Sequence, residues 1–319
     1  MRYTKWLALP CCAALAFGVA ACGGDDDSGS GGGSTTGAQN LSGTIRIDGS
    51  STVFPFAQAA AETFQQQNPN VKITVGESGT GGGFEKFCNG ETDISNASRA
   101  IEDDEQSACS EKRVTFAEIQ VANDGIAVVS NPNLKIDCLT TDQLKQLWST
   151  NRVKTYNQVD PKLPDAQVSL FGPGTDSGTF DFFTEEINGE EGRTRKDYQA
   201  SEDDNVLVQG VAGDQNGLGY FGFSYYEQNQ DKLNLIGVNA GGGCVKPSSA
   251  DIQNGNYKPL SRPLLMYPSS AAVKRLEVKA FMDYMVANHK EIAEAAQIVP
   301  MTDAQAQNSK AAVAKLAGT

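Results

Sequence analysis

Short apolar runs and amphipathic stretches alternate along the chain after residue 40. Three runs rich in β-branched residues predict strands, at residues 44–47, 71–75 and 92–95. After the first run, apolar residues recur every four positions at Phe56, Ala60 and Phe64, which predicts a helix over residues 54–67. Repeated strand and helix units of this kind indicate a parallel sheet, with ligand groups gathered at the carboxyl ends of its strands.

A second region with the same pattern begins near residue 125. Its predicted strands cover residues 125–129 and 168–171, and a strand at 264–267 leaves it. Thr140 to Gln143 fits a capping box, and Leu144, Leu147 and Trp148 supply the buried face of the helix that follows. A chain of 319 residues is long enough for two such cores.

The N-terminal residues predict export. Arg2 and Lys5 precede an apolar run over 6–21 that is shorter than the roughly 20 apolar residues of a membrane span, so residues 1–21 are expected to be a signal peptide. The small residues before Cys22 resemble a lipobox, which predicts a lipid on Cys22. The alternative is an ordinary signal peptide in which this cysteine has no role.

Residues 22–40 consist of this cysteine and a Gly, Ser and Asp-rich linker. Such a linker is expected to be a flexible tether with a reach of roughly 20–25 Å. No later stretch is long and apolar enough to span a membrane. The predicted location is therefore outside the cytoplasm, with a lipid anchor in the cell membrane and the body facing the periplasm or cell exterior.

The charge balance excludes one class of partner. A net charge of −13 and a pI near 4.6 argue against nucleic acid, which requires a basic face. A small anion is different, because a concave site with oriented N–H and O–H donors binds it locally.

Four Ser, Thr and Gly-rich loops follow predicted strands, at residues 48–52, 78–83, 96–99 and 174–179. Helix starts have unpaired N–H groups and a positive dipole end, so anions are favoured there. Any one loop could be an ordinary helix cap. Four such loops in one chain instead predict a cage for a tetrahedral oxyanion.

With these loops, residues 44–319 resemble the phosphate-binding proteins of bacterial phosphate ABC transporters. The stretch 48–53 resembles the family's first anion loop, which implies that Ser51 and Thr52 bind phosphate. The stretch 77–82 resembles the second loop, where a serine is the ligand. Its glycine spacing differs from the family pattern, so Ser78 and Thr80 are both candidates.

The loop at 176–179 matches the family best. The resemblance implies that the Ser177 and Thr179 hydroxyls and the Gly178 and Thr179 amides donate to the oxyanion. Two positions depart from a well-known branch of the family, because Arg99 replaces an aspartate and Pro173 replaces an arginine. Arg99 is expected to bind phosphate through two parallel hydrogen bonds. The alternative for Arg99 is an ion pair with the acidic cluster at 102–105.

The lost aspartate affects anion selectivity. Hydrogen phosphate donates a hydrogen bond and sulfate does not, so a buried acceptor disfavours sulfate. That acceptor could be Asp48, Glu77 or Asp176, or each of these could cap a turn.

The resemblance implies an α/β type II periplasmic-binding-protein fold with two discontinuous lobes. Lobe one would take residues 41–128 and 263–319, and lobe two residues 129–262. The implied protein is a monomeric phosphate receptor, not an enzyme, that closes around inorganic phosphate without a cofactor and delivers it to ABC transporter permease subunits. The alternatives are a binding lipoprotein for another oxyanion and a phosphate sensor or adhesion protein of the same fold.

Four cysteines remain after residue 22, and an even number in an exported protein suggests disulfides. Three pairings are possible. Cys88–Cys109 and Cys138–Cys244 are favoured because each pair then lies within one lobe. No C-x-x-C spacing exists and His289 is the sole histidine, so neither a metal site nor a serine hydrolase with a histidine base is expected. The G-x-G-x-x-G match at 217–222 is interpreted as a strand with its turn.

Overall fold

The structure is a computed structural model that describes residues 41–149 and 152–318. The predicted signal peptide, the lipidation site Cys22 and the whole linker up to residue 40 lie outside the described residues. Residues 40–319 form one unit by their internal contacts, and the account below concerns this unit alone.

Five strands form the first half of the sheet, in the order β2-β1-β3-β11-β4. Their bounds are β1 (Gly43–Gly49), β2 (Val71–Val75), β3 (Ile94–Ala97), β4 (Ile119–Ser130) and β11 (Ser261–Pro268). β1 is parallel to β2 and β3, whereas β11 runs antiparallel to β3 and β4. In β1, Ile45 and Ile47 alternate with more exposed positions, so one face of the strand enters the core.

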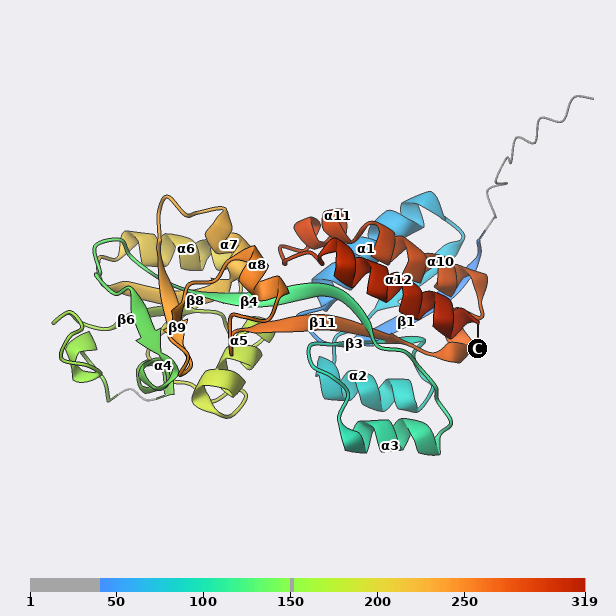
Figure 1. The fold of residues 1–319 in the computed structure, drawn as a ribbon, viewed down its shortest axis with the longest axis horizontal. Coiled ribbons are helices and arrows are strands. Elements are labelled where there is room, and N and C mark those ends of the chain that lie inside the picture. The colour runs from blue at the N-terminus through green and yellow to red at the C-terminus, as the bar shows by residue number, and fades with distance from the viewer. Residues whose placement is uncertain (1–40, 150–151, 319) are drawn as a thin grey trace, which may run out of the picture. The chain divides into compact units, whose positions relative to one another are not determined.

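Helices cover both faces of this half (Figure 1). One face carries α1 (Phe54–Gln67), α9 (Ser270–Val273), α10 (Leu276–Ala287), α11 (His289–Ala295) and α12 (Asp303–Ala317). The other carries α2 (Gly79–Cys88) and α3 (Asp103–Glu111). Within the described residues, no helix combines the length and apolar character needed to cross a membrane.

The second half of the sheet continues from β4 through β8, β6 and β7, and β9 pairs with β4, β5 and β10. Its strands are β5 (Cys138–Thr140), β6 (Ser169–Gly172), β7 (Gln199–Ala200), β8 (Gly217–Gly222), β9 (Asn234–Asn239) and β10 (Cys244–Val245). Its helices are α4 (Thr141–Ser149), the 3₁₀ turn η1 (Tyr156–Gln158), α5 (Gly178–Phe183), the π-helical η2 (Thr184–Asn188), α6 (Asp204–Gly213), α7 (Phe223–Glu227) and α8 (Ser249–Gln253). The G-x-G-x-x-G segment is thus the strand β8, as predicted.

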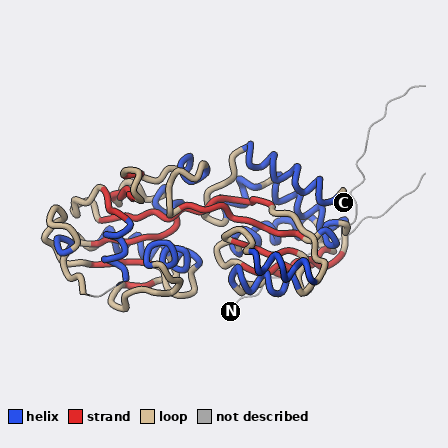
Figure 2. Tube along the Cα trace, turned by 60° about the horizontal axis from the view of Figure 1, so that its bottom comes forward, coloured by secondary structure: helices blue, strands red, loops and turns tan. Residues whose placement is uncertain are grey.

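Two long strands join the halves, which we call lobe one and lobe two (Figure 2). β4 pairs with β11 up to Gly125 and with β8 from Ile126 onward. The hydrophobic cores divide at the same place, because Ala122 packs in lobe one and Ile126 in lobe two. Two crossing strands are consistent with the predicted lobes, whose boundaries at 128/129 and 262/263 stay predictions.

The predicted helix over 54–67 is confirmed in full, but two other predicted bounds were wrong. Helix α2 begins at Gly79, inside the segment expected to be a loop, and the next glycines continue as helix. Gly79 itself has φ +76°, a conformation that favours glycine. A side chain at Gly83 would collide with Gly49, so these glycines let α2 approach β1 closely. β3 begins at Ile94, two residues later than predicted, and the Asp93 carboxylate directly before it pairs with Arg275.

Both favoured disulfides are confirmed. Cys88–Cys109 links the end of α2 to α3 in lobe one, and Cys138–Cys244 links β5 to β10 in lobe two. The first therefore fixes the pair of helices that flank two of the predicted anion loops.

Candidate functional site

The largest hollow near the predicted loops lies where the lobes meet, and we call it the interlobe cavity. Its volume is about 550 Å³. It is lined by residues 50–52, 78–81 and 98–100 of lobe one, 178, 181–182, 185–186 and 191 of lobe two, and 259 and 261–263 of the crossing segment. The structure thus brings Ser51, Thr52, Ser78, Thr80, Arg99 and Gly178 of the predicted site residues together.

The first loop continues directly from β1 into α1. Gly49 has φ +139°, and a side chain there would collide with the backbone of Asn96, so only glycine fits this turn. The Ser50 amide donates to the Asn96 carbonyl at 3.0 Å, which ties the loop to β3. The turn leaves Ser51 and Thr52 at the cavity wall.

The second loop forms the start of α2. The Ser78 hydroxyl donates to Asp48 Oδ1 at 2.5 Å, and Lys86 Nζ pairs with Asp48 Oδ2 at 2.8 Å. The Thr80 hydroxyl lies 3.1 Å from that of Ser98. The first-turn N–H groups of this ten-residue helix have no partner within the helix, so the segment 79–81 at the cavity wall suits an anion.

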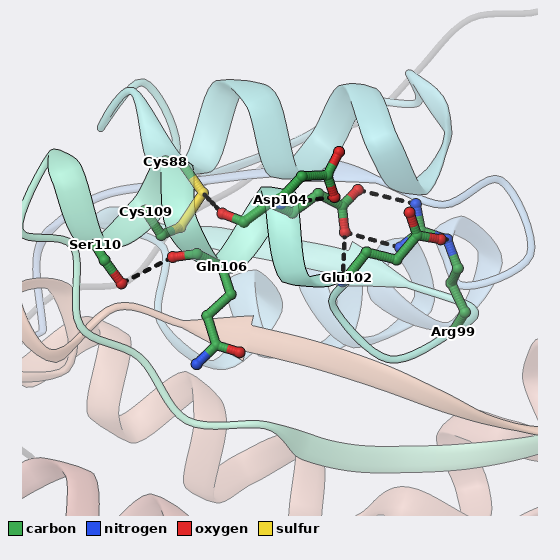
Figure 3. Close-up of a disulfide and its surroundings, with 8 residues drawn as sticks. Cys88, Arg99, Glu102, Asp104, Gln106, Cys109 and Ser110 are labelled. Carbon is green, nitrogen blue, oxygen red and sulfur yellow. Dashed lines mark hydrogen bonds and ion pairs between the residues drawn. A yellow bond between two sulfur atoms is a disulfide. The ribbon is translucent and has the colours of Figure 1, made fainter.

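Arg99 lines the cavity, but its guanidinium is already paired (Figure 3). Its Nη1 and Nη2 atoms lie 2.8 and 2.9 Å from the two carboxylate oxygens of Glu105, and its Nε lies 3.2 Å from Glu102. The hydrogen bond to Glu105 raises the pKa of Arg99. The guanidinium of Arg99 was expected to bind the anion. It is instead paired with the acidic cluster at 102–105, which was its alternative partner in the sequence analysis.

The buried cation of the cavity is Arg262 on β11, which the sequence reasoning missed. Its Nη2 donates to Thr52 Oγ1 at 2.9 Å and to the Gly178 carbonyl at 3.1 Å, so one guanidinium touches both lobes. Its Nε lies 3.2 Å from Asp124 Oδ2, and its carbon Cζ lies 3.9 Å from the centroid of the Phe182 ring. The side chain is only 12% exposed, and burial lowers its pKa. Arg262 lies two positions before the strand predicted at 264–267, and this position was the available signal.

The fourth loop does not point wholly into the interlobe cavity. Ser177 caps α5, because its hydroxyl accepts from the Thr179 amide at 3.2 Å. Ser177 and Thr179 line a neighbouring hollow of about 320 Å³, the side cavity. Gly178 borders both hollows and has no room for a side chain beside Thr52. The expected single cage is therefore divided in this structure by the contact of the two lobes.

The carboxylates of the site also differ from those expected. Asp48 is engaged by Ser78 and Lys86, and Glu77 and Asp176 line the side cavity. The interlobe cavity instead has four carboxylates on its lobe-two wall, which are Asp181, Glu185, Glu186 and Glu191.

Asp181 is the notable member of this wall. Burial first, and Glu191 next, raise the pKa of Asp181 to about 6. No hydrogen bond to its carboxylate is found among the described residues. It follows Gly178 by three positions in α5, which places both on one face of the helix. That spacing was a signal that the sequence reasoning did not use. Burial and Glu185 also raise the pKa of Glu186.

Within the described residues, no group of three or more His, Cys, Asp or Glu side chains is placed to hold a metal ion. The chemistry of the cavity is that of hydroxyl and guanidinium donors facing carboxylate acceptors.

Comparison with known proteins identifies the family of the chain. The profile of the PBP superfamily domain matches residues 34–289. Protein SphX of Synechococcus elongatus is 44% identical over 261 residues, which cover 81% of this chain and 77% of SphX. The phosphate-binding protein PstS of Staphylococcus saprophyticus is 41% identical over 245 residues, which cover 76% of this chain and 75% of that protein.

Two solved structures share the fold. The crystal structure of a possible phosphate binding protein from Planctomyces limnophilus is 40% identical, with a TM-score of 0.81, and the match covers 87% of this chain and 99% of that one. An ABC-type phosphate transport receptor from Vibrio cholerae, 20% identical, matches 79% of this chain and 97% of its own with a TM-score of 0.65. The predicted type II fold is confirmed, and the chain belongs to the PBP superfamily, in one family with protein SphX and the phosphate-binding protein PstS.

Proposed function

We propose that the protein captures inorganic phosphate in the interlobe cavity and delivers it to the permease of an ABC transporter. One observation carries the proposal. Arg262 is a buried cation that contacts Thr52 of lobe one and Gly178 of lobe two at the start of two helices. A cation at the junction of both lobes, beside helix N-termini, is suited to an oxyanion that both lobes must hold.

Lobe one supplies the neutral donors. Thr52 accepts a hydrogen bond from Arg262, so its own hydroxyl proton is available to an anion. Ser51 and Thr80 add hydroxyl groups at the same wall, whereas the Ser78 hydroxyl lines it but donates to Asp48. These groups bind phosphate without bringing further charge into the cavity.

Closure of the lobes supplies the remaining contacts. Ser177 and Thr179 border the side cavity, next to the contact between Gly178 and Thr52, and a small hinge motion would turn them toward the anion. In the closed form, Arg99 exchanges part of its pairing with Glu105 for phosphate. The crossing strands β4 and β11 act as the hinge.

Asp181 is the proposed acceptor for the phosphate proton. It is half-buried, lines the cavity and has no donor among the described residues. A phosphate hydroxyl would satisfy this carboxylate, whereas sulfate would leave two acceptors facing each other. Asp181 thus takes the role for which the sequence offered Asp48, Glu77 or Asp176.

The protein is proposed to act outside the cytoplasm, held to the cell membrane by a lipid on Cys22. Membership of this family of binding proteins supports export and transport. The closed lobes are the form that permease subunits would recognise.

Isothermal titration of the mature chain with phosphate and then sulfate, after bound anion has been removed, tests the function. We expect micromolar or tighter phosphate binding and no heat from sulfate. Equal binding of the two anions would favour a receptor for other oxyanions, and binding of neither would contradict the proposal.

A further inference from the structure

A basic hollow lies at the other end of lobe one from the interlobe cavity. It has a volume of about 320 Å³, and we call it the arginine pocket. Its lining combines Arg46, Arg113, Arg275 and Asp93 with small polar residues and with apolar ones such as Phe87 and Val114. Asp93 directly precedes β3, whereas the far end of β3 leads to Arg99 in the interlobe cavity. The two hollows thus lie at opposite ends of the same strand.

The pocket has more cations than its one carboxylate neutralises. Asp93 Oδ1 lies 2.7 Å from Arg275 Nη2, and Asp93 Oδ2 lies 3.5 Å from Arg46 Nε. Arg275 Nη1 also lies 3.6 Å from Glu277. No ion pair to Arg113 is found among the described residues. The lining therefore has a net positive charge in a chain whose total is −13.

Thr92, another residue of the lining, has a buried hydroxyl with no hydrogen-bond partner among the described residues. A buried hydroxyl without a partner costs free energy, and rotation of this side chain toward an anion in the pocket would relieve that cost. Guanidinium groups bind phosphate oxygens through paired hydrogen bonds.

A large apolar side chain projects beside the pocket. Leu276 follows Arg275 at the start of α10 and is 61% exposed. Among the described residues, only Val206 is also recorded as a strongly exposed large hydrophobic side chain. Basic residues flanking an exposed leucine are the pattern of a surface that rests on a membrane interface.

The N-terminal segment joins the body at this end of the lobe. Arg275 Nη1 donates to the carbonyl of Thr44 at 3.0 Å, at the start of β1. The predicted lipid on Cys22 lies 19 positions before Leu41, the first described residue. Because the chain enters lobe one here, that lipid would tether the body through this end.

We propose that the arginine pocket binds the phosphate groups of anionic lipid headgroups, with Leu276 in the interfacial layer. The proposal rests on the lipid anchor of the proposed function but not on phosphate binding in the interlobe cavity. The end of lobe one with the arginine pocket, opposite its anion loops, then contacts the membrane. Lobe two remains free to close against lobe one.

The test uses the mature chain from residue 22 with Cys22→Ser, so that no lipid contributes. Co-sedimentation is measured with vesicles of phosphatidylcholine alone and of phosphatidylcholine with phosphatidylglycerol, at low salt. We expect binding only to the anionic vesicles. Arg46→Gln with Arg113→Gln should lower the partition coefficient about 25-fold, about five-fold for each charge removed, and Leu276→Ser about five-fold.

Lys162→Gln with Lys232→Gln is the matched control, because it removes the same charge from exposed positions of lobe two. Its partition coefficient should stay within about two-fold of the parent. Phosphate titration of the arginine variant should be unchanged, since neither arginine touches the interlobe cavity. Lipid docking and phosphate capture can therefore fail separately.

Three results would overturn the lipid assignment. The first is equal binding of the parent to neutral and anionic vesicles. The second is unchanged partition of the arginine variant. The third is a second phosphate-binding event in solution that the arginine variant loses while vesicle binding is absent, which would identify free phosphate as the ligand.

Discussion

The two walls of the interlobe cavity offer opposite kinds of hydrogen-bonding group. The lobe-one wall presents hydroxyls and the first turn of α2, whereas the lobe-two wall presents Asp181, Glu185, Glu186 and Glu191. Arg262 lies on the crossing strand between them and contacts both. A site for an anion without protons would need donors on every side. Carboxylate acceptors can contact an anion favourably only if the anion itself carries protons, as phosphate does.

Removal of the shared cation is expected to have the largest effect. Arg262→Gln should weaken phosphate binding by roughly a hundred-fold or more, because it removes the buried positive charge and leaves Asp124 unpaired. Titration calorimetry measures the change, and circular dichroism checks the fold. Arg262→Lys keeps the charge but lacks the paired N–H donors of a guanidinium, so its phosphate affinity should lie between those of the parent and the Gln variant. A phosphate affinity of Arg262→Gln within about three-fold of the parent would show that Arg262 has only a structural role in the hinge strands.

Exchange of one acceptor tests the lobe-two wall. Asp181→Asn should let sulfate compete with phosphate, with the ratio of the two affinities falling about ten-fold, because an amide also donates. In the parent, sulfate should compete only below about pH 6, where the Asp181 carboxyl is protonated. Competition titrations from pH 5 to pH 8 measure this, with Asp176→Asn as the control. Sulfate rejection that persists in Asp181→Asn at pH 8 would exclude the proposed role.

The raised pKa of Asp181 also determines how the stability of the ligand-free protein should depend on pH. Burial raises the pKa of Asp181 to about 6 in the folded protein, from about 3.9 for an exposed Asp. The folded state therefore binds the proton more tightly, and stability falls as pH rises through the interval between these values. Urea unfolding should show Asp181→Asn to be more stable than the parent at pH 7 and equal to it below about pH 4. A less stable variant at pH 7 would contradict the assignment.

Arg99→Ala should have the smallest effect on phosphate binding, a loss of about five-fold or less, because Glu105 already uses its fork. Glu105→Gln sharpens the test, since it releases that fork. If Arg99 binds phosphate in the closed form, Glu105→Gln tightens binding by a few-fold and the added Arg99→Ala change cancels the gain. A loss in Arg99→Ala as large as that in Arg262→Gln would reverse the ranking of the two arginines.

The sequence predicted the parts of the fold that local pattern controls. The four-residue spacing of Phe56, Ala60 and Phe64 predicted α1 in full, and the strand pattern predicted β1 and β2. The cysteine pairs followed once the lobes were assumed. The start of helix α2 was predicted too late because its first turn is mostly glycine, which disfavours a helix until packing against β1 selects it.

The candidate site was predicted in its loops but not in its charges. Ser51, Thr52, Ser78 and Thr80 were recognisable because helix starts have a local signature. Arg262 has no such signature. Its role depends on β11 crossing between lobes beside Asp124, 138 positions away in the sequence, and only the folded sheet brings the two together. The pairing of Arg99 with Glu105 was left open because Arg99 could contact either the anion or the acidic cluster at 102–105, and only the folded chain decides between them.

The crossing strands also make lobe two an insertion in a single site of lobe one. Gly125 on β4 and Ser261 on β11 are paired directly across the sheet, so the chain leaves lobe one and returns to it at adjacent residues. A segment with adjacent ends can be exchanged as a cassette without stretching its host. Transplanting residues 126–260 from a relative would thus move the acceptor wall as one piece while the donor wall and Arg262 stay in place.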